Sequence, residues 1–154
     1  IKLLEPHGFI KLGLYSNLAR KEVVKLKELI KDKKIKNTNK DIKIFRQLII
    51  NQKRNSLSQY ITSSNDFFST SSVRDLLFHV QEHRFTIPEI SEILKDFNLE
   101  FLGFTFTNKY TRHKFSKTFP TDKKNISLEY WHQFEIDNPN IFAGMYQFWV
   151  RKIS

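Results

Sequence analysis

Two histidines and a glutamate lie close together near the middle of the sequence, and their spacing could support chemistry. His79, Glu82 and His83 fit the pattern H-x-x-E-H. On a helix, this pattern places two imidazoles one turn apart, where they can bind zinc with the glutamate beside them as a base. A zinc hydrolase also needs a ligand further downstream, and nothing around Glu129 or Glu135 marks either residue as one. We therefore predict no metal here and keep a zinc hydrolase as an alternative.

The same side chains could instead line a pocket for an organic molecule. Asp75, His79, Glu82 and His83 recur at intervals of about one helical turn, so on a helix they would form a polar stripe opposite the apolar face. A solvated surface is one explanation of such a stripe. A histidine and a carboxylate in a pocket can also take a proton from a substrate. On that hypothesis His79 and Glu82 are catalytic residues, and His83 binds substrate.

A helix must position these residues, and the sequence predicts one from Ser72 to about His83. Ser72 is a favourable N-cap residue, and Asp75 falls in the first turn. The apolar residues of this segment recur at helical spacing, so they are predicted to face the core; they are Val73, Leu76, Leu77 and Val80.

A second helix and a strand follow directly. Thr86 and Glu89 have the spacing of a capping box, in which each side chain binds a backbone N–H at the start of the helix. Asn98 can adopt the left-handed conformation that ends a helix. Between them, one helical face is apolar and consists of Ile90, Ile93, Leu94 and Phe97. The segment Leu99–Thr107 is then predicted to be a buried strand.

The remaining segments also predict a mixture of strands and helices. The almost continuous apolar run from Phe9 to Tyr15 predicts a strand that is buried on both faces, as in a parallel sheet. Residues 108–125 are polar and basic and predict an exposed excursion, whereas Met145–Val150 predicts a final strand. Two amphipathic helices lie between the first strand and Ser72, with apolar faces formed by Ala19, Val23, Leu26 and Ile30 and by Ile42, Phe45, Leu48 and Ile49. This succession predicts an α/β fold.

The composition limits the class of protein further. The chain has 154 residues, which suits one domain, and 40% of them are hydrophobic, which argues against disorder. The sequence contains no cysteine, no signal peptide and no apolar run long enough to span a membrane, so we predict a cytoplasmic protein without a membrane partner. The net charge of +10 comes from lysines spread along the chain and does not by itself predict a nucleic-acid partner. The first residue is Ile1 rather than methionine, which predicts a fragment or a processed chain.

Three segments resemble class I S-adenosylmethionine-dependent methyltransferases. Residues 4–12, with the sequence Leu-Glu-Pro-His-Gly-Phe-Ile-Lys-Leu, are similar to the L-x-P-G-G turn that enters the fifth strand in that family. Residues 85–104 look like the family's late helix followed by a leucine-glycine-phenylalanine strand. Residues 145–152 resemble its closing strand, which inserts antiparallel. Gly13-Leu14-Tyr15-Ser16 with Arg20, and then residues 74–79, look like a subgroup that is often joined to tetratricopeptide repeats.

The resemblance implies the C-terminal half of a Rossmann-like methyltransferase sheet. Residues 1–154 would form this part of one domain, with a helical insertion at about residues 17–84. The cofactor would be S-adenosylmethionine, although the glycine-rich loop and the acidic residue that bind it in this family do not occur in the chain. We expect a cofactor-binding half or an oligomeric partner to supply the neighbouring strands.

The helical insertion would then form a pocket for a small-molecule or protein acceptor. Ligands of open α/β sheets bind beyond the carboxyl ends of the strands, so Tyr15, Ser16 and Arg20 are predicted to bind substrate together with His83. On this interpretation the chain contributes the acceptor side of a methyltransferase and is inactive alone. A non-catalytic helical binding or regulatory module is the main alternative.

Overall fold

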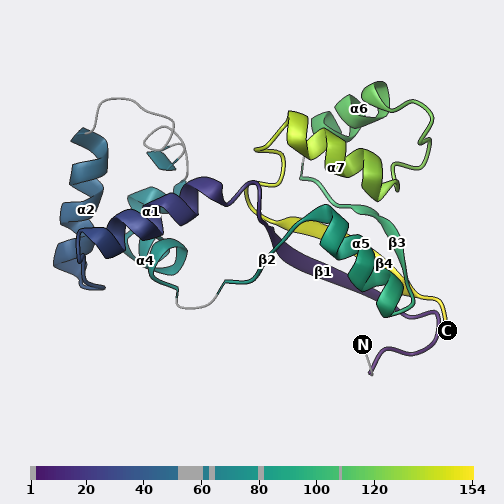
Figure 1. Ribbon diagram of the computed structural model, residues 1–154, viewed down its shortest axis with the longest axis horizontal. Helices are drawn as coiled ribbons and strands as arrows, with labels where there is room; N and C mark the ends of the chain where they lie inside the picture. The colour runs from purple at the N-terminus through teal and green to yellow at the C-terminus, as the bar shows by residue number, and fades with distance from the viewer. Residues whose placement is uncertain (1–2, 52–60, 63–64, 80–81, 108) are drawn as a thin grey trace. The chain divides into compact units, whose positions relative to one another are not determined.

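The computed structural model describes residues 3–51, 61–62, 65–79, 82–107 and 109–154, and they form a mixed α/β protein (Figure 1). The chain divides into two compact units, which we describe separately. The first unit joins Ile1–Ala19 to His83–Ser154, and the second unit is Arg20–Glu82. Each unit has its own hydrophobic core. Within the described ranges, no helix combines the length and the apolar character needed to cross a membrane.

The first unit contains a four-stranded sheet with the order β2-β1-β4-β3. Its strands are β1 (Phe9–Ser16), β2 (Arg84–Phe85), β3 (Leu99–Phe104) and β4 (Tyr146–Lys152). β2 is parallel to β1, whereas β4 lies between β1 and β3 and is antiparallel to both. The strands predicted at residues 9–15 and 145–150 are confirmed with small shifts of their ends. The strand predicted at residues 99–107 is shorter and ends at Phe104.

The two faces of the sheet differ in exposure. Along β4, buried Tyr146, Phe148 and Val150 alternate with exposed residues that include Trp149. Along β1, exposed residues alternate with half-buried ones from Phe9 to Leu14, and Phe9 is 59% exposed. The prediction that this strand is buried on both faces is therefore wrong, because β1 pairs antiparallel with β4 in a sheet whose second face is solvated. We call the face that carries Phe9 and Trp149 the open face.

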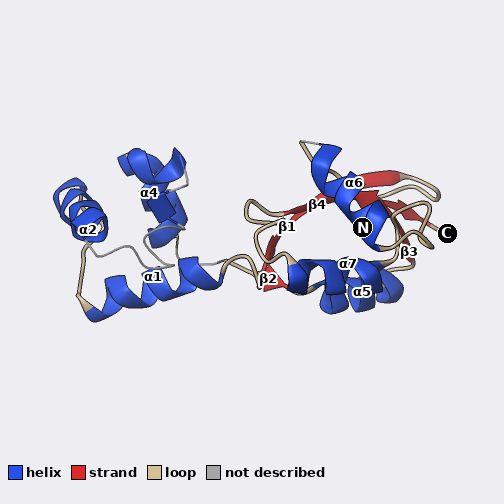
Figure 2. Cartoon of the chain, turned by 90° about the horizontal axis from the view of Figure 1, so that it is seen from above, coloured by secondary structure: helices blue, strands red, loops and turns tan. Residues whose placement is uncertain are grey.

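The opposite face packs against helices α5 (Ile87–Asp96) and α7 (Leu128–Asp137), which lie side by side beneath the strands in Figure 2. α5 follows the sequence prediction except at its end, because Phe97, predicted on the apolar face, lies just beyond the helix and is 51% exposed. The Thr86 hydroxyl accepts a hydrogen bond from the Glu89 amide at 3.3 Å, and the Glu89 carboxylate accepts one from the Thr86 amide at 2.6 Å. Asn98 ends the turn with a φ of 53°. The predicted capping box and left-handed residue are confirmed.

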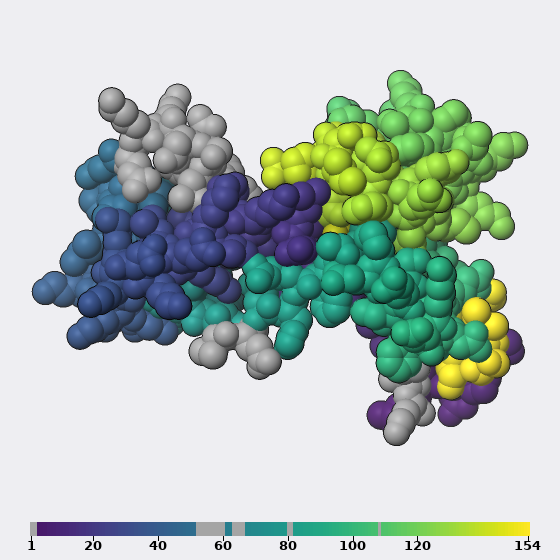
Figure 3. Space-filling model, in the orientation of Figure 1, coloured from purple at the N-terminus to yellow at the C-terminus, as the bar shows by residue number. Residues whose placement is uncertain are grey.

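The segment predicted as an exposed excursion, residues 108–125, contains helix α6 (Lys109–Thr118). The side chain of Phe115, in α6, is fully buried and stacks on Trp131 of α7, with 3.7 Å between the ring centroids. The other side chains of α6 are mostly polar and form part of the surface shown in green in Figure 3. The prediction missed this helix because a single apolar anchor gives no periodic signal.

The second unit is helical. It contains α1 (Lys21–Asp32), α2 (Asn39–Asn51), the 3-10 helix η1 (Asn65–Phe68) and α4 (Thr70–Phe78). The predicted apolar faces of α1 and α2 are confirmed, since all their members are buried except Leu48, which is half-buried. The core of this unit consists of Val23, Leu26, Ile30, Ile42, Phe45, Ile49, Ile61, Phe67, Val73 and Leu77.

Helix α4 begins and ends earlier than predicted. Its N-cap is Ser69, whose hydroxyl accepts a hydrogen bond from the Ser72 amide at 3.4 Å. The helix ends at Phe78, and His79 already has an extended backbone with φ −60° and ψ 127°. The predicted helix is confirmed from Ser72 to Phe78, but its predicted continuation to His83 is wrong, because the backbone is already extended at His79. Val80, predicted to face the core, lies outside the described residues.

Candidate functional site

The carboxyl end of β1 carries two of the predicted substrate-binding residues. Tyr15 and Ser16 pair in parallel with Arg84 and Phe85 of β2. Just beyond them, the backbone amide of Asn17 donates a hydrogen bond to the Phe85 carbonyl at 2.8 Å. This pairing fixes the end of β1 on the side away from β4. The side chain of Ser16 is buried rather than open to a ligand, with a residue exposure of 1%.

Ser16 belongs to a network of polar groups inside the first unit. Its hydroxyl donates a hydrogen bond to Glu135 Oε1 at 2.5 Å and accepts one from the Ala19 amide at 3.0 Å. The Tyr146 hydroxyl lies 2.8 Å from both carboxylate oxygens of Glu135. Glu135, on α7, is only 2% exposed. We call Ser16, Glu135 and Tyr146 the buried carboxylate network, and it ties β1, α7 and β4 together.

Burial dominates the electrostatics of this network. It raises the pKa of Glu135, and the hydrogen bonds from Ser16 and Tyr146 and the charge of His132 oppose the increase without cancelling it. Burial also raises the pKa of the Tyr146 hydroxyl, so this group remains a hydrogen-bond donor at neutral pH. The network can therefore hold a proton or a negative charge at a fixed position, but its hydroxyls already have partners. Because Glu135 accepts a hydrogen bond from Ser16, the network can hold the end of β1 in position.

The role of Glu135 was not predicted from the sequence, where this residue was considered only as a metal ligand and set aside. The relevant signal is local. Glu135 follows the buried Trp131 by four residues and adjoins the buried Phe134, so it lies on the apolar face of α7. A carboxylate on such a face requires buried hydrogen-bond donors. The donors come from distant parts of the sequence, and only the fold identifies them.

In the second unit, two predicted site residues lie together. The Nε atom of Arg20 is 3.8 Å from Glu82 Oε1, and the Nζ atom of Lys27 is 3.3 Å from Glu82 Oε2. The side chains of Arg20 and Glu82 are only 9% and 10% exposed. Glu82 is thus held between two cations, an arrangement that orders these side chains and neutralises the carboxylate's charge.

The two predicted histidines are exposed and belong to different units. His79 follows α4 in the second unit, and His83 precedes β2 in the first. They do not share a helical face, so the geometry on which the zinc alternative was based is not formed. Among the described residues, no group of three or more histidine, aspartate or glutamate side chains could hold a metal ion. The candidate residues therefore fall into two groups, Tyr15, Ser16 and His83 in the first unit and Arg20, His79 and Glu82 in the second.

Comparison with protein-family models gives no match for this chain, and comparison with curated protein sequences gives none either. The class of protein must therefore be argued from the strand order and from the residues at the carboxyl ends of the strands.

Proposed function

We propose that this chain is the C-terminal, acceptor-side part of a class I S-adenosylmethionine-dependent methyltransferase domain. One observation carries the proposal, namely the order and direction of the strands. β4 lies between β1 and β3 and is antiparallel to both, so β1 and β3 are parallel to each other. An antiparallel last strand inserted between two parallel strands is the arrangement that the resemblance of the sequence implies. Helix α5, which leads directly into β3, agrees with the same arrangement.

The proposed site lies at the carboxyl ends of the parallel strands. Because β1 and β3 run in the same direction, Ser16 at the end of β1 and Thr105 just beyond β3 lie toward the same edge of the sheet. Open α/β sheets bind their ligands at this edge. The buried carboxylate network fixes the end of β1 there, which supports a role in holding Tyr15 and the following turn in place.

The edge of β1 supports the proposal that a further set of strands completes the sheet. β2 pairs with β1 only at Tyr15 and Ser16. Among the described residues, no strand pairs with Phe9–Leu14 on the side away from β4. Parallel sheets bury such edges between neighbouring strands. We assign the cofactor-binding half to this edge, either from the same polypeptide or from a partner.

The described residues do not themselves fit S-adenosylmethionine. The hydroxyl of Ser16, at the carboxyl end of β1, is buried and already has Glu135 and Ala19 as partners. We therefore assign no cofactor contact to the described residues of this chain. The cofactor would supply the methyl group, and the residues of this chain would align the acceptor and receive its proton.

Within this proposal, His79 is the better candidate for a proton acceptor. It is exposed, whereas the carboxylate of Glu82 lies between Arg20 and Lys27. Each carboxylate oxygen of Glu82 already faces a cation, which leaves it less available to a substrate. Glu82 is then proposed to keep Arg20 in position, and Arg20 to bind the acceptor.

The first test measures cofactor binding by the complete polypeptide from its own gene. We expect S-adenosylhomocysteine, the demethylated product, to bind with about one molecule per chain in isothermal titration calorimetry. Absence of binding to the complete polypeptide would contradict the proposal and would favour a non-catalytic binding module.

The second test measures transfer of a tritium-labelled methyl group from S-adenosylmethionine to the small molecules and proteins of a cell extract. We expect His79→Ala to lower the transfer rate by about a hundredfold or more, as for loss of a general base. His113→Ala, which removes an exposed histidine of α6, is the matched control and should leave the rate unchanged. Equal rates for both variants would contradict the role given to His79, while cofactor binding would still support the class of enzyme.

A further inference from the structure

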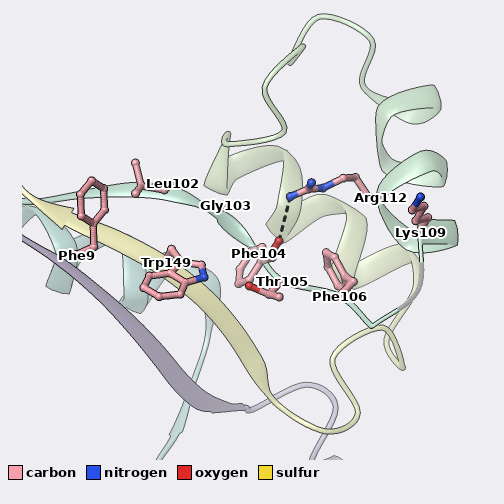
Figure 4. Close-up of a pocket in the computed structure, with 9 residues that line it drawn as sticks. All are labelled: Phe9, Leu102, Gly103, Phe104, Thr105, Phe106, Lys109, Arg112 and Trp149. Carbon is pink, nitrogen blue, oxygen red and sulfur yellow. Dashed lines mark hydrogen bonds between the residues drawn. The ribbon is translucent and has the colours of Figure 1, made fainter.

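A cavity on the open face of the sheet lies apart from the buried carboxylate network. Its volume is about 460 Å³, which is within the usual range for small-molecule sites of roughly 300–1,000 Å³. It extends from the open face to the residues just beyond β3, as Figure 4 shows. The lining residues are Phe9, Leu102, Gly103, Phe104, Thr105, Phe106, Lys109, Arg112 and Trp149. We call this cavity the open-face groove.

One end of the groove is aromatic and exposed. Phe9 of β1 is 59% exposed and Trp149 of β4 is 44% exposed, although both are large apolar side chains. Their strands pair antiparallel, with Phe9 opposite Arg151 and Trp149 opposite Lys11, so both rings stand on the same face. Exposed rings on a sheet face can stack against the flat surface of an aromatic ligand.

The other end of the groove is positively charged. Arg112 and Lys109 come from α6, whose ten residues include no aspartate or glutamate. The guanidinium of Arg112 donates a hydrogen bond to the Phe104 carbonyl at 3.3 Å, which holds it over the end of β3 (Figure 4). None of the described lining residues is acidic. A fixed guanidinium next to a flexible lysine is a common arrangement for binding phosphate and carboxylate groups.

Glu100, an acidic residue on the open face, is paired with Arg151 rather than with the groove cations. Glu100 accepts a hydrogen bond from Arg151 Nε at 2.9 Å, and neither residue lines the groove.

The backbone at Gly103 leaves the floor of the groove open. Gly103 has a φ of 128°, and a Cβ atom placed there would meet only Arg112, at 3.9 Å. A β-bulge accompanies this glycine, and bulges are frequent next to binding sites.

We propose that the open-face groove binds an aromatic anion, that is, a flat ring system carrying a phosphate or carboxylate group. The rings of Phe9 and Trp149 contact the flat body, and Lys109 and Arg112 bind the anionic group. This assignment follows from the charge and the exposed rings and does not depend on the methyltransferase proposal.

The test uses 1-naphthyl phosphate as the probe, and 1-naphthol and inorganic phosphate as its two halves. Calorimetric titrations are run on the full polypeptide with excess S-adenosylhomocysteine, so that a cofactor site is not counted. We expect 1-naphthyl phosphate to bind more tightly than either half. Arg112→Gln should weaken it about tenfold, equivalent to about 1.4 kcal/mol, without changing the binding of 1-naphthol. Trp149→Ala should weaken both aromatic probes.

Lys117→Gln is the matched control, because Lys117 is an exposed cation of α6 that does not line the groove. It should leave all three affinities unchanged, and circular dichroism should show that every variant is folded. The proposal is overturned if phosphate binds as tightly as 1-naphthyl phosphate, which would show an adventitious ion only. It is also overturned if Arg112→Gln and Lys117→Gln have equal effects.

Discussion

At the scale of single residues, two carboxylates in the first unit behave in opposite ways. Glu89 is exposed in the capping box, and its hydrogen bonds with Thr86 lower its pKa. Glu135 is buried, and burial raises its pKa despite the hydroxyls of Ser16 and Tyr146. The role of Glu89 can be predicted from the sequence, because its partner is three residues away. The role of Glu135 cannot, because its partners Ser16 and Tyr146 come from two different strands.

Glu135 should make the folded state less stable as pH rises. Its pKa is higher in the folded protein than the ordinary value of 4.5, so the folded state binds this proton more tightly than the unfolded chain. The resulting contribution to the free energy of unfolding is complete below pH 4.5 and is lost as pH rises through the raised pKa. We expect Glu135→Gln, which is never ionised, to remove this pH dependence in urea unfolding experiments between pH 4.5 and 7.

The comparison variant is Glu135→Ala, which leaves the hydroxyls of Ser16 and Tyr146 without their acceptor. Loss of a buried hydrogen-bond partner costs about 1–3 kcal/mol, so this variant should be less stable than Glu135→Gln at pH 7. If both variants keep the wild-type dependence on pH, a group other than Glu135 is responsible, which would contradict the prediction.

At the scale of elements, the success of prediction depended on whether the apolar residues of a segment are periodic. α5 has three buried apolar residues at helical spacing as well as a capping box, and it was predicted correctly. α6 buries only Phe115 and was predicted as a loop. The end of α4 was missed for a different reason. The polar stripe continues to His83 in the sequence, but the helix ends at Phe78 and His79 already has an extended backbone.

The bulge in β3 provides a prediction at this scale. Its register on β4 shifts between Phe101 and Gly103, and Gly103 has a φ of 128° that other residues rarely adopt. We expect Gly103→Ala to lower the free energy of unfolding by about 1–3 kcal/mol, because the strain remains even though there is space for the methyl group. Gly144→Ala is the control, since no atom lies within 4 Å of its added Cβ, and it should be neutral or slightly stabilising. Equal effects in urea unfolding would contradict this explanation.

At the scale of the whole molecule, each of the two units has a core made only from its own residues. Phe148 of β4 is fully buried in the first core, and Phe45 of α2 is fully buried in the second. The α/β class of the fold could be predicted from the succession of segments. The sequence predicts the second unit only as a helical insertion at about residues 17–84. The structure divides the chain at Arg20–Glu82.

Separate cores should give separate responses to mutation. We expect Phe45→Ala to cost about 3–5 kcal/mol and to speed amide hydrogen exchange in α1, α2 and α4. Phe148→Ala should cost a similar amount and speed exchange in β3, β4 and α5. Hydrogen-exchange mass spectrometry measures both patterns, under conditions in which the two variants have lost the same free energy of unfolding. Faster exchange over the whole chain in either variant would show that the two cores unfold together.

The pairing of β1 with β4 also has a consequence for how the protein is made. Phe9 pairs with Arg151, so nearly the entire chain separates the two strands. On a ribosome, β1 is made long before β4, its antiparallel partner along Phe9–Leu14, whereas the contacts of α1, α2 and α4 are closer in sequence and can form in the meantime. Synthesis from the N-terminus therefore allows the helical unit to fold before the sheet acquires β4, the strand between β1 and β3. Until β4 is synthesised, the edge of β1 that β4 will cover has unpaired backbone N–H and C=O groups, which a chaperone can protect from pairing with other chains.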